Sequence, residues 1–245
     1  MKIGIYGGTF NPPHLGHVKA ARAAFESLGL DKLLVIPSGV PPHKPLPEGS
    51  PSGRERLELA RLAFQEAPGA EVCALEVEAE GVSYTVDTLR TLGKKHEGAA
   101  FFLIMGSDMF LTLDSWYEAE EILRRATPAV LLRGTREDGK VRDYAAFLRQ
   151  KFGVESRFVE NAIIEVSSTE LREKLRGRNG REMLSDPVYS AIIARRYYGA
   201  RPDFEWLREK SYAMVLPRRV PHIKGCEEEA VRLARHWGAD EEEAR

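Results

Sequence analysis

The stretch GGTFNPPHLGH, residues 7–17, decides the fold because it joins a predicted strand to the first long predicted helix. In such a turn the first backbone N–H groups of the helix have no partner within the helix, and the helix dipole adds partial positive charge. The turn is therefore suited to hold an anion such as a phosphate. Its spacing differs from the dinucleotide-binding GxGxxG pattern and from the P-loop.

The first side chains of the turn fit this interpretation. Gly7 and Gly8 leave room for a ligand to approach the backbone closely. Thr9 and Asn11 add a hydroxyl and an amide, which can both donate to and accept from a polar ligand.

Two histidines complete the turn. His14 and His17 are three residues apart, so their imidazoles share one face of the helix and can reach the same anion. A single histidine is more often a structural residue with a satisfied hydrogen bond. This pair, however, follows the end of a predicted strand, where open α/β sheets bind ligands, and we therefore expect it to be functional.

Outward from this turn, short apolar runs alternate with helical spacing of apolar residues, as in βαβ units. The predicted strands are residues 2–6, 32–37, 72–77, 100–105, 129–133 and 156–158. The pattern predicts a doubly wound α/β fold with a mainly parallel sheet. From residue 167 onward only helices are predicted. One has Asp186 as its N-cap and Pro187 as its first helical residue and stops at Gly199, and another covers residues 226–237. The arginine-rich residues 176–181 are expected to form an exposed loop.

Composition limits the classes of function. The 245 residues carry 36 basic and 37 acidic side chains, a formal charge of −1, which does not favour a nucleic-acid or membrane-surface partner. The longest apolar run, residues 99–105, is far shorter than the roughly 18 to 20 residues that cross a bilayer. The N-terminus lacks the apolar core of a signal peptide. Cys73 and Cys226 are too far apart in sequence for a disulfide framework, so we expect a cytoplasmic protein.

Other segments carry groups that suit nucleotides. The loop PPHKP, residues 41–45, presents Lys44, which can close over a triphosphate, although an exposed loop lysine is the simpler alternative. In MGSDMFLTLDSWY, Gly106 permits a close turn and Asp108 can accept hydrogen bonds from ribose hydroxyls. Trp116 can stack on a pyridine ring, although tryptophan is more often part of a core.

Two segments begin predicted helices. In GVSYTVDT, residues 81–88, a hydroxyl and backbone amides could receive an anion, and capping of the helix by Ser83 or Thr85 explains the pattern equally well. In EVSSTELR, residues 165–172, the SSTE sequence is typical of an N-capping box, with Arg172 one turn inside the helix.

Together these segments resemble the nucleotidylyltransferases with an HxGH signature, here His14, Leu15, Gly16 and His17, and in particular bacterial nicotinate-mononucleotide adenylyltransferases. The resemblance covers residues 1–200, which it identifies as the nucleotidylyltransferase domain, with residues 201–245 as a helical extension. One departure is RGTRE, residues 133–137, where relatives often carry Arg-Pro-Gly beside the adenine, and no adenine contact is assigned there.

The resemblance implies roles for individual residues. Catalysis is expected from His14, His17 and Lys44. ATP is expected to bind at Gly7, Gly8, Thr9, Phe10, His14, Gly16, His17, Gly106, Asp108, Ser168, Thr169 and Arg172. The mononucleotide is expected to bind at Asn11, Lys44, Arg56, Tyr84, Thr85, Asp108, Trp116 and the backbone amide of Tyr117.

The implied reaction joins ATP and nicotinate mononucleotide into nicotinate adenine dinucleotide and pyrophosphate, by direct attack of a phosphate on the α-phosphorus. Mg²⁺ is expected to enter on the triphosphate, with no metal site on the protein. Alternatives are adenylyl transfer to nicotinamide mononucleotide or phosphopantetheine, and a non-catalytic nucleotide-binding scaffold.

The end of the chain carries a second, weaker resemblance. Residues 222–244 resemble the opening helix of an HD-type phosphohydrolase domain, as in fusions of the two enzymes, which suggests a truncated fusion. A single histidine, His222, cannot hold the metal pair of such an enzyme, so no hydrolase activity is expected. The sequence leaves open whether the chain forms a homo-oligomer.

Overall fold

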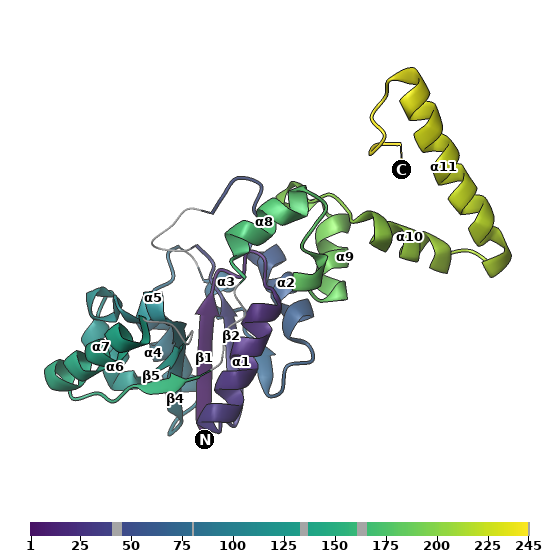
Figure 1. Cartoon of the computed structure of the whole chain (residues 1–245). Helices are drawn as coiled ribbons and strands as arrows, with labels where there is room; N and C mark the ends of the chain where they lie inside the picture. Colours follow the sequence, from purple (N-terminus) through teal and green to yellow (C-terminus); the bar gives the residue numbers. More distant parts are fainter. Residues whose placement is uncertain (41–45, 80, 133–136, 161–165, 245) are drawn as a thin grey trace.

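The computed structural model describes residues 1–40, 46–79, 81–132, 137–160 and 166–244. Within these residues lies a sheet of six parallel strands in the order β3-β2-β1-β4-β5-β6 (Figure 1), which confirms the predicted doubly wound fold. The strands are β1 (Lys2–Gly8), β2 (Lys32–Pro37), β3 (Ala70–Val72), β4 (Ala100–Gly106), β5 (Ala126–Leu131) and β6 (Arg157–Val159).

The helices connect and cover these strands. They are α1 (Leu15–Leu28), α2 (Gly53–Phe64), α3 (Leu75–Glu78), α4 (Thr85–Lys95), α5 (Ser107–Phe110), α6 (Ala119–Arg125), α7 (Glu137–Phe152), α8 (Ser168–Arg176), α9 (Asp186–Ala194), α10 (Phe204–Ala213) and α11 (Val220–Trp237). Short 3₁₀ turns lie at Leu113–Ser115, Arg181–Met183, Tyr197–Gly199 and Pro217–Arg219.

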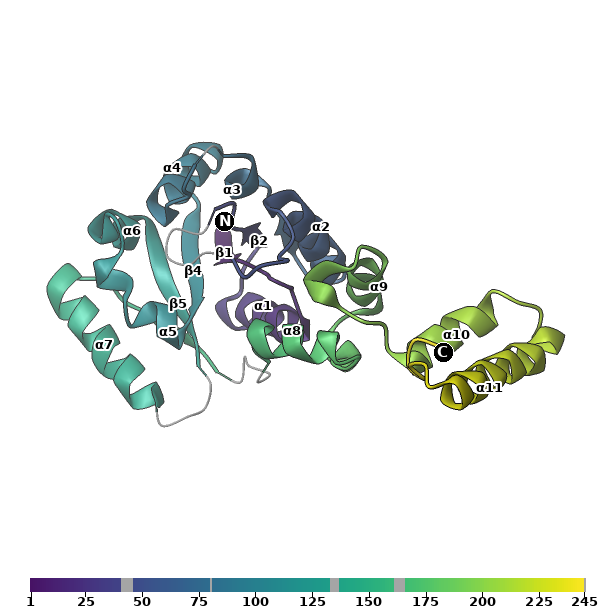
Figure 2. The ribbon, with the colours of Figure 1, turned by 90° about the horizontal axis from the view of Figure 1, so that it is seen from above.

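The sheet has a core on each face because successive strand side chains point to opposite sides. On one face Ile3 and Ile5 of β1 pack in a cluster with Leu89 of α4 and Ile122 of α6. On the other face Tyr6 packs in a cluster with residues of α1 and α2. Seen from above, α4 and α6 lie on one side of the sheet and α1 on the other (Figure 2).

The third predicted strand is wrong over most of its length. Strand β3 ends at Val72, and residues 75–77 of the predicted strand belong to the short helix α3 (Leu75–Glu78). The carboxylate of Glu76 is mostly buried and accepts a hydrogen bond of 2.8 Å from the hydroxyl of Thr88. This contact with α4 joins residues twelve apart, and a pattern of alternating side chains cannot reveal it.

Residues after β6 form a helical region that packs on the outer side of α2. One buried cluster joins these helices to α2. It contains Leu171 and Leu175 of α8, Val188 and Ile192 of α9, and Leu59 of α2. Helix α9 begins one residue earlier than predicted, after Ser185, and ends at Ala194, while Gly199 closes a separate 3₁₀ turn.

The helices α10 and α11 lie outside the α/β body (Figures 1 and 2). The predicted exposed loop of residues 176–181 is wrong in one respect, because Arg178 attaches these helices to the body. Its guanidinium lies 4.2 Å from the ring of Phe204 and donates to the carbonyl of Pro202 at 2.9 Å and to the carboxylate of Glu242 at 3.2 Å. None of the described helices is both long and apolar enough to span a membrane.

Candidate active site

The site lies at the carboxyl ends of β1 and β4. These neighbouring strands pair with Tyr6 opposite Ile104, so Gly7 and Gly106 reach the same edge of the sheet. The chain leaves β1 toward β2 on one side and leaves β4 toward β5 on the other, which makes this edge the point where the strand order reverses. Open α/β sheets bind ligands at such a point.

Residues 7–17, here called the histidine loop, run from the end of β1 into the first turn of α1. The backbone at the end of β1 is accessible to a ligand. Gly7 is exposed, and a Cβ placed there would meet no atom within 4 Å, so a ligand can approach its backbone. Thr9 is exposed as well. Phe10 is buried and packs edge-on against Tyr6 and Phe64, with ring centroids 5.6 Å apart in both pairs. The Phe10 ring therefore has a structural part, and the predicted ATP contact at this residue, which its backbone could make, stays a prediction.

The two histidines lie together, as predicted. His14 precedes the first turn of α1 and His17 lies within it, and their ring centroids are 3.7 Å apart at an angle of 31°. The backbone N–H of His14 donates to Nδ1 of His17 at 3.2 Å. Because Nδ1 is the acceptor, the neutral ring of His17 carries its proton on Nε2, which is then available as a donor. Gly16 is buried between them in the same turn.

Burial keeps both imidazoles neutral in the ligand-free protein. Desolvation lowers the pKa of His14 to about 4 from its ordinary value of 6.5. Desolvation, and then the neighbouring His14, lowers the pKa of His17 well below 6.5. At neutral pH the pair therefore offers N–H donors rather than fixed positive charge.

Two buried polar atoms of the loop lack hydrogen-bond partners among the residues that the structure describes. They are Oδ1 of Asn11 and Nδ1 of His14, in side chains that are 3% and 6% exposed. An unpaired buried polar atom is costly, and native proteins keep few of them. Both atoms lie in the loop where the sequence predicts a polar ligand.

Arg56 of α2 fixes the backbone of the histidine loop through hydrogen bonds to carbonyl groups. It is fully buried, and its two terminal nitrogens donate to the carbonyls of Thr9 at 2.7 Å, Ser38 at 2.7 Å and Gly39 at 2.8 Å. Three of the five guanidinium N–H groups are used by backbone carbonyls, so Arg56 has a structural part in the loop, and its contact with a substrate phosphate stays a prediction. It fixes the end of β1 to the segment after β2.

Helix α8 holds the loop from the other side. Arg172 is buried and donates to the carbonyl of Asn11 at 2.7 Å and to the hydroxyl of Thr169 at 3.1 Å. The hydroxyl of Ser168 donates to the carbonyl of Pro12 at 3.3 Å. Ser168 and Arg172 thus lie at the site as predicted but position the loop. Thr169 is exposed beside them.

The predicted helix cap at EVSSTELR is present in α8. The Ser167 side chain accepts from the backbone N–H of Glu170 at 3.0 Å. The cap predicted for the start of α4 is absent, because Tyr84 occupies the N-cap position there and makes no side-chain cap. Capping by Ser83 or Thr85 is therefore wrong, and the hydroxyl of Ser83 instead donates to the carbonyl of Glu76 at 3.3 Å.

Tyr84 and Tyr117, here called the tyrosine pair, come together from separate segments. Their ring centroids are 4.8 Å apart, and the residues are 38% and 55% exposed. Thr85, the first residue of α4, directly follows Tyr84 and is partly buried. Trp116 is partly buried against the core, with its indole nitrogen 3.3 Å from the hydroxyl of Thr112. The tyrosine pair is thus more exposed than Trp116, the residue predicted to stack on the pyridine ring.

The remaining predicted residues fall at the same edge or outside the described part of the chain. Asp108 is exposed at the start of α5, directly after β4. Val40 and Val82 form a parallel bridge, which brings the segments after β2 and before α4 together. Lys44 and residues 133–136 lie outside the described residues.

One residue of the site had no signal in the sequence. The side-chain amide of Asn11 donates to the hydroxyl of Ser50 at 2.8 Å, across 39 positions of the chain. Ser50 stands in a loop whose composition is typical of any turn. Only the fold shows that it fixes the amide orientation and leaves Oδ1 of Asn11 as the unpaired atom.

Fold and site together define a nucleotidyltransferase, and the cytidylyltransferase-like family model matches residues 5–174. Two relatives described as probable nicotinate-nucleotide adenylyltransferases, from Gloeobacter violaceus and Salinibacter ruber, are 38% and 35% identical. The matches cover 80% and 81% of this chain and 96% and 98% of the relatives. The chain belongs to the nicotinate-nucleotide adenylyltransferase family, which confirms the family predicted from the sequence.

A solved structure supports the fold. Plasmodium falciparum nicotinic acid mononucleotide adenylyltransferase complexed with NaAD superposes with a TM-score of 0.66 at 18% sequence identity. The match covers 82% of this chain and 98% of that one.

Proposed function

We propose that this protein transfers the adenylyl group of ATP to nicotinate mononucleotide, which gives nicotinate adenine dinucleotide and pyrophosphate in NAD biosynthesis. The families of the relatives support this reaction. The observation that carries the proposal in the structure is the histidine pair, stacked at 3.7 Å beside the start of α1, with unpaired buried atoms on His14 and Asn11.

The proposed chemistry is a direct displacement. An oxygen of the 5′-phosphate of the mononucleotide attacks the α-phosphorus of ATP, and the bond from that phosphorus to the pyrophosphate oxygen breaks. No protein nucleophile is needed, so the protein contributes positioning and stabilisation of charge. The Nε2–H of His17 and the free N–H groups at the start of α1 are the donors that we assign to the α-phosphate.

The other residues divide between the two nucleotides. Lys44 is proposed to close over the triphosphate, and Asp108 to bind ribose hydroxyls. Trp116 and the backbone amide of Tyr117 are proposed to receive the pyridine ring and its carboxylate, with Tyr84 and Thr85 beside them. Arg56 and Arg172 keep the histidine loop in place.

Mg²⁺ is proposed to arrive as part of the MgATP substrate. Across the described ranges, no group of three or more His, Cys, Asp or Glu side chains is placed to hold a metal ion. Mg²⁺ bound to ATP keeps phosphate oxygens and water as its ligands. The ion would neutralise charge on the triphosphate.

The deciding experiment is a substrate panel. The purified chain is incubated with MgATP and one of nicotinate mononucleotide, nicotinamide mononucleotide or phosphopantetheine, and both pyrophosphate and the adenylylated product are measured. We expect the highest kcat/KM with nicotinate mononucleotide. A higher value with either other acceptor would reject the proposed substrate, and no pyrophosphate with any acceptor would favour a non-catalytic scaffold.

Several coarser predictions accompany this proposal. Two free cysteines, Cys73 and Cys226, are compatible with action in the cytoplasm. The division into a nucleotidylyltransferase domain over residues 1–200 and an extension over residues 201–245 remains a prediction. So do a homo-oligomer and the relation of residues 222–244 to an HD-type phosphohydrolase.

A further inference from the structure

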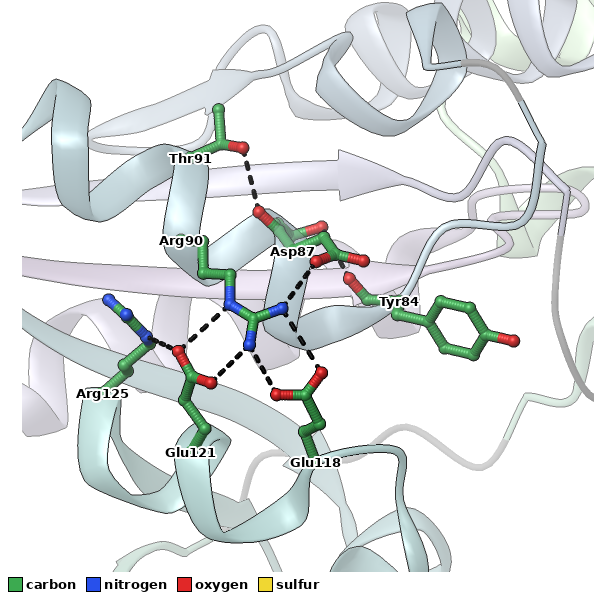
Figure 3. A network of polar contacts seen from close by, with 8 residues as sticks. Tyr84, Asp87, Arg90, Thr91, Glu118, Glu121 and Arg125 are labelled. Carbon is green, nitrogen blue, oxygen red and sulfur yellow. Dashed lines mark hydrogen bonds and ion pairs between the residues drawn. The ribbon is translucent and has the colours of Figure 1, made fainter.

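Arg90 of α4 is surrounded by three carboxylates, as Figure 3 shows. Its Nε donates to Glu121 at 3.1 Å, one terminal nitrogen donates to Asp87 at 3.0 Å and to Glu118 at 3.4 Å, and the other donates to Glu118 and Glu121. These are five hydrogen bonds, equal to the number of N–H groups on a guanidinium. Arg125 also donates to Glu121, at 2.8 Å.

The network connects the starts of two helices. Glu118 and Glu121 belong to the N-cap and first turn of α6, whereas Asp87 and Arg90 lie in the first two turns of α4. The tyrosine pair stands at the same two places, because Tyr84 is the N-cap of α4 and Tyr117 directly precedes Glu118. In Figure 3 the ring of Tyr84 points away from the guanidinium. The Tyr84 ring thus extends away from Arg90, which is not among the predicted ligand contacts.

Glu118 has a backbone conformation that needs external support. Its φ of 52° and ψ of 43° place it in the left-handed region, which is unfavourable for a residue with a Cβ unless its surroundings hold it there. The two contacts of its carboxylate with Arg90 supply such a hold. The same carboxylate raises the pKa of the Tyr117 phenol through a hydrogen bond. Glu118 therefore connects Arg90 directly to one ring of the tyrosine pair.

Stability alone does not explain this network. The side chains of Arg90 and Glu118 are 35% and 33% exposed, and a single ion pair of that exposure contributes little to the free energy of folding, whereas a network of several charges contributes more. The two helices are already held together by Leu89 and Ile122 in the core. The ion pairs also hold the φ and ψ angles of Glu118. These angles in turn set the direction of the preceding residue, Tyr117.

We propose that Arg90 and Glu118 are positioning residues that hold the tyrosine pair in the geometry that receives the pyridine mononucleotide, and so set the affinity for the second substrate. This inference rests on the proposed function, because it assigns the tyrosine pair to that nucleotide. It adds two residues that have no place in the predicted site and that do not touch either substrate.

The test compares Glu118→Gln and Arg90→Lys with the unsubstituted protein in steady-state assays. Each variant should raise KM for nicotinate mononucleotide about five- to tenfold, with kcat and KM for ATP within twofold. The double variant should be no more impaired than the more impaired single variant, because both changes break the same contact between Arg90 and Glu118. Glu26→Gln, which breaks the exposed pair of Glu26 with Arg22, is the matched control and should leave all three constants unchanged.

Unchanged KM for nicotinate mononucleotide in both single variants would overturn the inference, and so would an equal rise of both KM values or loss of folding in both. A thermal midpoint within about 3 °C of the unsubstituted protein identifies a folded variant. The unsubstituted protein separates the two proposals. If it forms dinucleotide while the variants match it, only this inference fails, and if it forms none, the proposed function fails first.

Discussion

The histidine loop and the tyrosine pair lie at the same edge of the sheet but are built in opposite ways. In the loop, Asn11 and His14 are buried and His17 is partly buried, and the loop backbone is held by Arg56 and Arg172 from two different helices. The tyrosine pair is exposed, and its support is a surface ion-pair network around Arg90.

This contrast indicates two kinds of function. A rigid loop with buried donors suits the reacting phosphates, because preorganised donors are effective only where water and motion are excluded. An exposed aromatic pair suits recognition of a ring that enters from solvent. We therefore expect changes in the histidine loop to lower kcat and changes near the tyrosine pair to raise one KM.

The largest effect is expected for His17→Ala. The substitution removes the Nε2–H donor that we assign to the α-phosphate, and kcat should fall on the order of 10² or more, with binding of each nucleotide within several-fold, as when one oxyanion donor is lost. Steady-state kinetics and nucleotide binding by calorimetry measure the two quantities. His236→Ala, at the exposed end of α11, is the control. Normal turnover of His17→Ala would exclude this residue from the mechanism.

A smaller loss of kcat is expected for Arg172→Met. The substitution leaves the carbonyl of Asn11 without its buried donor and frees the loop on the α8 side. A hydrogen bond to a charged group contributes about 1.5–3 kcal/mol, so kcat should fall about tenfold or more. Arg149→Met, on the exposed side of α7, provides the comparison. If Arg172→Met raised only KM for ATP, Arg172 would be a ligand of the triphosphate, and the positioning role would be wrong.

The sequence was sufficient for the architecture and for the histidine loop because both depend on local order. Alternating apolar runs placed five of the six strands, and a strand followed by GGTFNPPHLGH placed the loop at the sheet edge. The nearness of His14 to His17 follows from helical spacing alone.

The partners of the arginines could not be predicted in this way. Arg56 and Thr9 are 47 positions apart, and Arg172 and Asn11 are 161 apart. A motif shows that an arginine stands near a phosphate site, but its burial decides whether the guanidinium meets a ligand or a carbonyl. Arg178 is a further case, since a loop rich in glycine and arginine gave no sign of its contact with Phe204.

Near the tyrosine pair, Trp116→Ala should raise KM for nicotinate mononucleotide about tenfold, while KM for ATP stays within twofold. The reason is that a stacked aromatic pair contributes about 0.5–1.5 kcal/mol beyond its buried area. Trp237→Ala is a matched control, since Trp237 is 77% exposed on α11, far along the chain from the site. An equal rise of both KM values would mean that Trp116 supports the whole edge of the sheet and has no specific role for the ring.

The smallest effect concerns the pH dependence of folding. The pKa of His14 is about 4 in the folded chain against 6.5 when unfolded, so between these values the unfolded state binds more protons. The stability from keeping His14 neutral is complete above pH 6.5 and is lost as the pH falls toward 4. The loss is on the order of 2–3 kcal/mol, since one pKa unit corresponds to about 1.4 kcal/mol.

Denaturant unfolding of the ligand-free protein at pH 7 and pH 4 measures this loss. His14→Asn should reduce the fall in the free energy of unfolding by about 2 kcal/mol, whereas His236→Asn should leave it unchanged, since carboxylates contribute equally to all three chains. An unaltered fall in His14→Asn would mean that folding does not lower the pKa of this ring. Burial would then not decide the charge of His14, and the contrast between buried neutral donors and the exposed tyrosine pair would no longer apply.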